Sequence, residues 1–132
     1  MTGPTDAQWA ALAASARRAC GNTWSPYSRF PVGAAVLAGD GAVAAGCNVE
    51  NASSGLTVCA ERVAVFRAVA EGARAIDALV VYTPTAEPVT PCGACRQVLA
   101  EFGPDAAVRC ICDGERVLDY RLSDLLPHAF SL

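Results

Sequence analysis

Three cysteines of this chain have the spacing that a metal site needs. Cys92 and Cys95 stand three positions apart, so on a helix both thiols lie on one face. Cys59 lies 33 positions before Cys92 and is followed closely by an acid, Glu61. Three thiolate ligands leave one position of a tetrahedral zinc ion open for water, which is typical of catalytic rather than structural zinc. The pattern predicts one Zn²⁺ per chain, bound by Cys59, Cys92 and Cys95.

Glu61 is the predicted acid–base group of this site. Zinc lowers the pKa of a bound water from ~15.7 to about 7, and a nearby carboxylate can move the water's proton to a substrate. Three thiolates leave the bound ion with a net negative charge, which weakens this effect. We expect Arg62 to donate hydrogen bonds to a ligand sulfur and so draw charge away from the metal. Helix N-termini beside the cysteines would also favour the ionised thiols.

The elements that must position these side chains follow from periodicity and from helix and turn signals. Helices are predicted over residues 58–71 and 91–102, the second with Pro91 at its first position. Thr5-x-x-Gln8 resembles a capping box that opens a helix over 6–20. Strands are predicted at 32–38, 42–49, 76–82, 107–112 and 115–119, and a last helical turn at 123–126. This order predicts one α/β domain over residues 1–132, a three-layer α/β/α fold with a five-stranded mixed sheet.

Composition narrows the classes of function. Of the 132 residues 53% are hydrophobic, the net charge is −3, and all ten basic residues are Arg. This balance argues against the basic surface that nucleic-acid binding requires. The chain has no apolar run of about 18 residues and no basic, apolar leader at residues 1–10. We expect a cytoplasmic protein that binds neither nucleic acids nor membranes.

The remaining cysteines and the single histidine allow other interpretations. An odd total of seven cysteines without a leader does not favour a disulfide framework, and free cysteines are mostly buried. A fourth thiol would make the zinc site structural, and a C-x-x-C pair can be a redox centre, but both interpretations leave Glu61 without a role. His128 is expected at the surface or an interface rather than as a base. The cysteines outside the proposed site are Cys20, Cys47, Cys110 and Cys112.

The double motif resembles the zinc nucleoside deaminases, whose signature joins C-A-E to P-C-x-x-C with a Glu that does not bind the metal. The resemblance covers most of the chain. A Cys as the first ligand and the chain length are similar to the small homotetrameric cytidine deaminases, in which neighbouring subunits complete each site. The further matching segments are Pro26–Ala35 (PYSRFPVGAA), Asn48–Asn51 (NVEN), Pro91–Gln97 (PCGACRQ) and Leu125–Phe130 (LLPxxF).

The resemblance implies hydrolytic deamination of cytidine and deoxycytidine to uridine and deoxyuridine plus ammonia, a step of pyrimidine salvage. It assigns Asn48 and Glu50 to the ribose hydroxyls. It implies that Phe30 packs on the base, where stacking on an aromatic ring is worth roughly 1–3 kcal/mol. The backbone groups of Ala60 and Thr90 would contact the polar edge of the base.

Two positions near the sugar bear on the substrate. The resemblance implies that Phe130 reaches a neighbouring subunit's site. Ser54 stands where the family commonly has Tyr, in N-V-E-N-A-S-Y-G, which leaves the sugar preference open. A second interpretation is therefore a deaminase of a modified cytosine nucleoside such as blasticidin S, since that related family shares both metal motifs. A third, from another class, is a non-catalytic interaction module stabilised by a four-ligand zinc, which would have no need of Glu61.

Overall fold

In the computed structural model, which describes residues 3–132, a five-stranded mixed sheet with the order β2-β1-β3-β4-β5 forms the centre. β1 is antiparallel to β2 and β3, β3 is parallel to β4, and β5 returns antiparallel to β4. The elements are α1 (Asp6–Cys20), β1 (Gly33–Ala38), β2 (Val43–Cys47), the 3₁₀ turn η1 (Ser54–Leu56), α2 (Ala60–Ala70), β3 (Ile76–Tyr82), α3 (Gly93–Phe102), β4 (Ala107–Ile111), β5 (Leu118–Arg121) and α4 (Leu122–Leu125).

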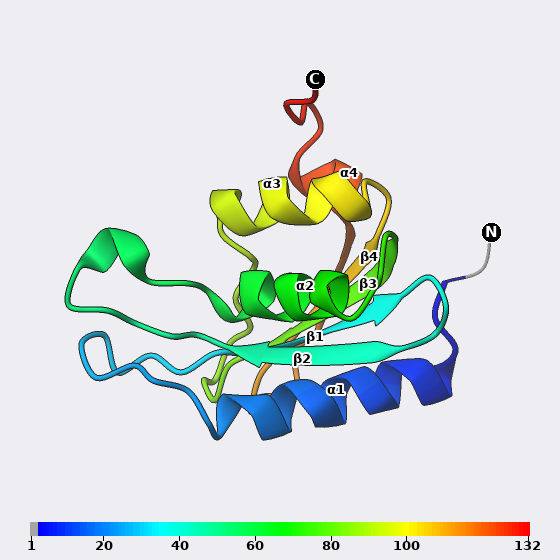
Figure 1. Ribbon diagram of the computed structural model, residues 1–132. Coiled ribbons are helices and arrows are strands. Elements are labelled where there is room, and N and C mark those ends of the chain that lie inside the picture. Colours follow the sequence, from blue (N-terminus) through cyan, green and yellow to red (C-terminus); the bar gives the residue numbers. More distant parts are fainter. Residues whose placement is uncertain (1–2) are drawn as a thin grey trace.

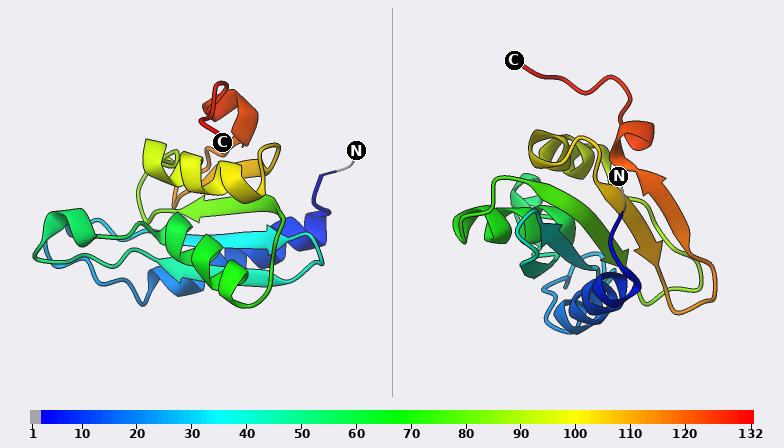
Figure 2. Two further views of the ribbon diagram at one scale, coloured as in Figure 1. Left: turned by 45° about the horizontal axis from the view of Figure 1, so that its top comes forward. Right: turned by 90° about the vertical axis from the view of Figure 1, so that its right-hand side faces the viewer.

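Helices cover both faces of the sheet, which confirms the predicted α/β/α layers. α1 lies on one face, and α2 and α3 lie on the other (Figures 1 and 2). Alternate residues of β1 enter two separate cores: Ala34 and Val36 pack on the α2 side, and Ala35 and Leu37 pack on the α1 side. All six residues of β1 are therefore buried, as expected for a strand covered on both faces.

The two metal motifs occupy equivalent places at the starts of α2 and α3. Cys59 and Cys92 are the N-cap residues, both in extended conformation, and neither thiol makes a capping hydrogen bond within the described chain. The prediction that Pro91 is the first helical residue is wrong, because the extended backbone of Cys92 places Pro91 before the cap. The capping box of α1 is confirmed, with Thr5 and Gln8 bonded reciprocally.

The last strand also differs from the prediction. It spans Leu118–Arg121 rather than 115–119, with Leu118 opposite Cys110. The connection between β4 and β5 is longer than a tight turn because it packs against residues 85–86, which follow β3. The Asp113 amide donates to the Thr85 carbonyl, and Gly114 lies so close to Ala86 that a Cβ there would be 2.2 Å from its carbonyl oxygen. This packing holds residues 113–117 away from the ladder.

The two long loops, residues 21–32 and 48–59, extend from the same end of the sheet, where α2 and α3 also begin (Figure 1). The segments lie together because Trp24 and Val58 both form bridges with Val49. No helix in residues 3–132 has the length and apolar character needed to span a bilayer. The fold thus brings the metal motifs and the two long loops to one end of the molecule.

Candidate metal centre and substrate site

The three predicted ligands meet at the starts of α2 and α3. The Sγ atoms of Cys59 and Cys92 are 3.9 Å apart, and those of Cys92 and Cys95 are 3.4 Å apart. All three sulfurs lie within 4.8 Å of one another, and they form the only such cluster of potential metal ligands among the described residues. Tetrahedral Zn–S bonds of about 2.3 Å require sulfurs about 3.8 Å apart. The thiols therefore fit a zinc ion without rearrangement of the helices.

The surroundings of the thiols favour their ionised form. The hydrogen bond with Cys95 lowers the pKa of Cys59 to about 5, and Arg62 adds to the effect. The same hydrogen bond to the Cys59 thiolate raises the pKa of Cys95, which is also buried. In the absence of a metal, Cys59 is thus the thiol that ionises, and Cys95 keeps its proton and donates it to Cys59. A divalent metal would replace the thiol protons.

Arg62 reaches the cluster from the first turn of α2. Its Nη2 lies 3.4 Å from the Cys59 Sγ and 3.5 Å from the Thr57 carbonyl oxygen. Its Nε is buried, and it is the single buried side-chain nitrogen or oxygen in the described chain without a hydrogen-bond partner. A guanidinium held this close offsets part of the negative charge of three thiolates, which is the role that the sequence predicts for Arg62.

Glu61 is buried next to the thiols, with 6% of its surface exposed. Burial raises the pKa of its carboxyl group to about 7, and the negative charge of Cys59 acts in the same direction. A group with this pKa exchanges a proton readily near neutral pH, which suits general acid–base chemistry. Ala60, the first residue of α2, joins Cys59 to Glu61 in the chain and is fully buried.

Asn48 and Glu50 are buried and hold the loop that carries Phe30. The Asn48 amide donates to the Phe30 carbonyl at 2.9 Å, and its Oδ1 accepts from the Val32 amide at 2.9 Å. Glu50 Oε1 accepts the amides of Tyr27 and Ser28, and its Oε2 accepts the Ser28 hydroxyl.

The side chains of Asn48 and Glu50 can each make one further hydrogen bond. The second N–H of the Asn48 amide and a lone pair on Glu50 Oε2 remain for a ligand. A hydroxyl group, which both accepts and donates, would satisfy this pair. The segment is joined to the metal ligands because Val49 and Val58 exchange two backbone hydrogen bonds of 2.9 Å directly before Cys59.

Sequence reasoning missed the residues that support this pair. The Thr23 hydroxyl donates to the Asn48 side chain and backbone carbonyl, and Ser28 binds Glu50 as described above. The serine lies inside the PYSRFPVGAA match, so its place in that segment was the available signal. Thr23 has no comparable signal in the sequence.

The other predicted contact residues are exposed at or near this end. Phe30 is 41% exposed and Phe130 is 72% exposed. The Phe130 carbonyl accepts a hydrogen bond of 3.0 Å from Gln97 of α3, which leaves the aromatic ring free. Ser54 lies on the exposed turn η1, and Thr90 is exposed directly before the Pro91–Cys92 segment.

The residues of the alternative interpretations lie elsewhere. Cys20, Cys110 and Cys112 are buried, Cys47 is half-buried, and none of them joins the ligand cluster in the described chain. His128 is exposed on the segment that follows α4. Within residues 3–132 the cluster therefore offers three thiols and no fourth side-chain ligand.

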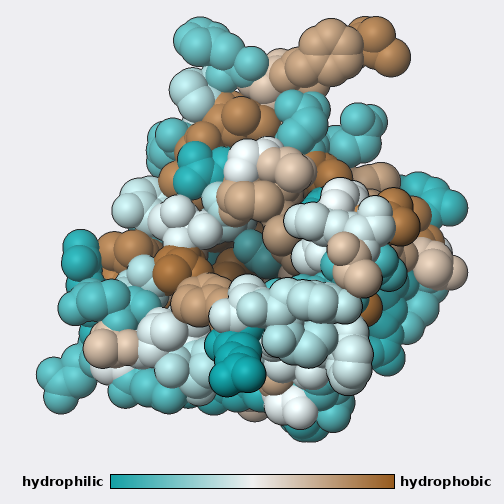
Figure 3. Space-filling view, turned by 90° about the vertical axis from the view of Figure 1, so that its left-hand side faces the viewer, coloured by the Kyte–Doolittle hydropathy of each residue, from teal (hydrophilic) through white to brown (hydrophobic). Residues whose placement is uncertain are grey.

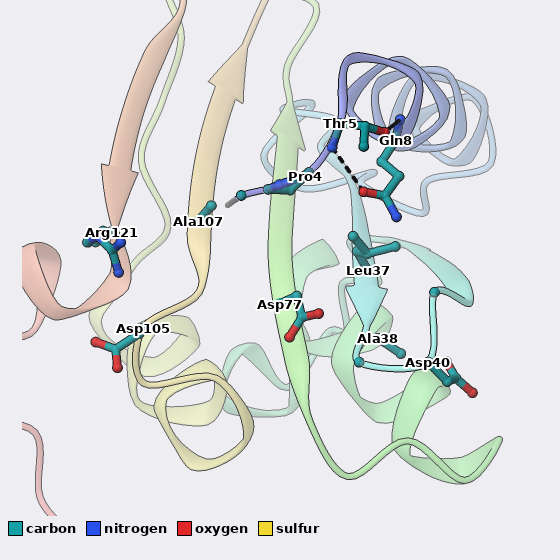
Figure 4. A pocket seen from close by; sticks show the side chains of 13 residues that line it. Pro4, Thr5, Gln8, Leu37, Ala38, Asp40, Asp77, Asp105, Ala107 and Arg121 are labelled. Carbon is teal, nitrogen blue, oxygen red and sulfur yellow. Dashed lines mark hydrogen bonds between the residues drawn. The ribbon is translucent and has the colours of Figure 1, made fainter. Parts of the chain in front are cut away.

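The molecule has a hollow at each end of the sheet, and the two hollows are lined by different residues. Figure 3 faces the end with the long loops and shows apolar surface around a hollow. Another hollow, of about 520 Å³, lies at the opposite end of the sheet, between Leu37, Asp77, Asp105 and Arg121 (Figure 4). Its lining contains neither a thiol nor an imidazole and shares no residue with the thiol cluster.

Comparison with known proteins gives a consistent result. Residues 6–111 match the family model described as the cytidine and deoxycytidylate deaminase zinc-binding region. The chain is 47% identical over 122 residues to the cytidine deaminase of Sporosarcina psychrophila, covering 91% of this chain and 89% of the relative. The crystal structure of cytidine deaminase from Burkholderia pseudomallei matches with a TM-score of 0.87 and 47% identity, covering 92% of this chain and 98% of that one. The blasticidin-S deaminase of Bacillus cereus is more distant, with 30% identity over 108 residues and 76% of each chain covered.

Proposed function

Because the chain belongs to the cytidine and deoxycytidylate deaminase family, we propose that it is a zinc enzyme that hydrolyses cytidine to uridine and ammonia. The same site would act on deoxycytidine. One observation supports this proposal above the others: three thiols and a buried carboxyl group with a raised pKa meet at the starts of two helices. A structural zinc site would need neither the open fourth position nor Glu61.

Glu61 and Arg62 have different roles in the proposed reaction. When bound, zinc supplies an acidified water. Glu61 would accept one proton of that water and deliver it to N3 of the pyrimidine as the water oxygen bonds to C4. It would then carry the proton of the resulting 4-hydroxyl group to the 4-amino group, which leaves as ammonia when the C4–N bond breaks, so one water is consumed for each ammonia released. Its pKa of about 7 matches both directions of transfer. Arg62 limits the negative charge at the thiolates.

The loop residues hold the nucleoside. Asn48 and Glu50 are arranged to receive a ribose hydroxyl with their unused N–H and lone pair. Phe30, fixed through its carbonyl by Asn48, would pack on the base. The backbone groups of Ala60 and Thr90 would contact the polar edge of the base.

We also propose a homotetramer in which neighbours complete each site, Phe130 among the contributed residues. The large exposed apolar side chains at the loop end support an interface there, since monomeric proteins rarely leave such a patch open. They include Trp24 (59% exposed), Tyr27 (62%) and Leu56 (66%). Light scattering coupled to size-exclusion chromatography would measure the mass directly, and a monomer would refute this part of the proposal.

The activity test compares cytidine, deoxycytidine and blasticidin S as substrates, with product followed by absorbance and by ammonia release. Glu61→Gln should lower kcat by about 10²- to 10⁴-fold while zinc content is unchanged. Glu71→Gln is the matched control, because Glu71 ends the same helix and pairs with Arg67 on the surface. Full activity of Glu61→Gln would contradict the role of this residue.

A modified nucleoside is the second candidate, and Ser54 is the observation that favours it. If blasticidin S is converted and both simple nucleosides are not, the substrate proposal is wrong although the zinc chemistry stands. Absence of any turnover in protein with one bound zinc per chain would favour the non-catalytic module.

A further inference from the structure

Arg96, in the first turn of α3, makes three hydrogen bonds to two separate parts of the chain. Its Nε donates to the Pro91 carbonyl at 2.7 Å, and its Nη2 lies 3.2 Å from the Thr90 hydroxyl. Its Nη1 donates to the Leu125 carbonyl at 2.9 Å. A half-buried guanidinium thus joins the segment before Cys92 to the end of α4.

All three hydrogen-bond partners of Arg96 are uncharged groups. Four ion pairs join side chains of the described residues, and none of them includes Arg96. Its charge is directed at two carbonyls and a hydroxyl. The rigid planar fork of an arginine can satisfy acceptors in several directions at once, which the single ammonium group of a lysine cannot.

The Pro91 and Leu125 carbonyls accept no other hydrogen bond among the described residues. α4 has four residues, so the Leu125 carbonyl belongs to a helix end without internal partners. Pro91 has no N–H to donate, and the Cys92 thiol does not cap α3, since its hydrogen-bond partners are the thiols of Cys59 and Cys95. Arg96 therefore supplies a fixed contact directly before the metal ligand Cys92.

We propose that Arg96 is a positioning residue, which holds the Thr90–Pro91 segment and, through it, Cys92 in place beside Cys59. The activity part of this inference rests on the proposed function, but the metal-binding part does not. Loss of the fork would let Cys92 move away from the other thiols, and it would displace the Thr90 backbone that is proposed to contact the base. The first change lowers zinc retention and kcat, and the second raises KM.

The experiment uses the zinc-loaded full chain. Arg96→Gln and Arg96→Lys are compared with Arg74→Gln, because Arg74 also donates to backbone carbonyls, those of Val69 and Ala73, but beyond the opposite end of α2. Zinc release to a chelating dye, melting temperature, and kcat and KM per bound zinc are measured for each protein. A purely structural role would lower the amount of folded protein without changing turnover per bound zinc.

Arg96→Gln should release zinc at least about tenfold faster than wild type, and its kcat/KM per bound zinc should fall by about 10- to 100-fold, since a shift of about 1 Å costs up to 10²-fold. Arg96→Lys should lie between wild type and Arg96→Gln, and Arg74→Gln should match wild type.

The proposal is overturned if Arg96→Gln equals Arg74→Gln in both zinc release and kcat/KM. If Arg96→Gln does not fold, Arg96→Lys decides, and wild-type behaviour of that variant overturns the role of the fork. If wild type does not convert cytidine, the proposed function fails, and the comparison of zinc release alone decides the role of Arg96.

Discussion

A methyl group added at Gly46 should displace the start of α2 and impair the site without direct contact with it. Gly46 is buried in β2, opposite Ala34 of β1. A Cβ there would lie 2.5 Å from the Ala64 amide nitrogen, 2.7 Å from the Ala60 carbonyl oxygen and 2.9 Å from the Val63 Cβ. All three atoms belong to the beginning of the helix that also carries Glu61.

The size of the displacement follows from these distances. Ordinary contacts begin at 3.4 Å, so the first turn of α2 must move by several tenths of an ångström, and by nearly 1 Å at its closest point. Overpacking of this kind costs about 1–3 kcal/mol of stability. Because reacting groups misplaced by 1 Å lose about 10²-fold in rate, we expect kcat to fall by roughly 10- to 100-fold.

Gly103→Ala is the control variant, because it should destabilise the fold by overpacking without moving the residues of the site. A Cβ at Gly103 would lie 2.3 Å from the Ile76 carbonyl oxygen, so this variant is also overpacked, but at the end of α3 farthest from its ligands. Thermal unfolding and steady-state kinetics with cytidine, normalised to bound zinc, are measured for both variants. We expect both to be destabilised and only Gly46→Ala to lose turnover per bound zinc. Equal turnover in the two variants would refute the reasoning.

Three further predictions concern the loops and the metal. Asn48→Ala leaves the Val32 amide without its acceptor and should cost about 1–3 kcal/mol while raising KM, by thermal unfolding and kinetics. The hydrogen bond from the Ser28 hydroxyl, aided by the amides of Tyr27 and Ser28, holds the pKa of Glu50 below its ordinary value of 4.5. The ionised Glu50 therefore stabilises the fold fully above pH 4.5, and this stabilisation is lost as the pH falls through the lowered pKa. Wild type should therefore lose stability on acidification below pH 4.5, measured by tryptophan fluorescence, and Glu50→Gln should lose less over the same range. Removing zinc with a chelator should abolish activity and lower the melting temperature, and about 2.7 kcal/mol of stability should return at a free zinc concentration 100 times Kd; an unchanged melting temperature would contradict the thiol site.

The sequence predicted those features that depend on local signals. The capping box at Thr5 and Gln8 marks the start of α1, and the apolar run 76–82 coincides with β3. The cysteine motifs begin two helices, and their spacing is enough to assign the three thiols to one cluster. Each of these signals lies within a few residues of the feature that it specifies.

Features that depend on distant contacts could not be predicted in this way. The limits of β5 depend on the packing of Gly114 against Ala86, and the cap position before α3 is associated with the contact of Arg96 with Pro91. Thr23 supports Asn48 across 25 positions of the chain, and no periodic pattern marks it. Such partners become visible only when the loops are placed side by side in the structure.

The order of the three cysteines along the chain also determines when a metal site can exist during synthesis. Cys59 precedes β3, while Cys92 and Cys95 follow it, and β3 lies between β1 and β4. A ribosome releases the N-terminal part of a chain first, so the emerging protein presents one thiol of the three while the first hairpin and α2 are already available to fold. The complete set of ligands exists only after β3 and the first turn of α3 have been synthesised. A prematurely terminated chain that ends before Cys92 therefore carries one thiol of the three and cannot form the site.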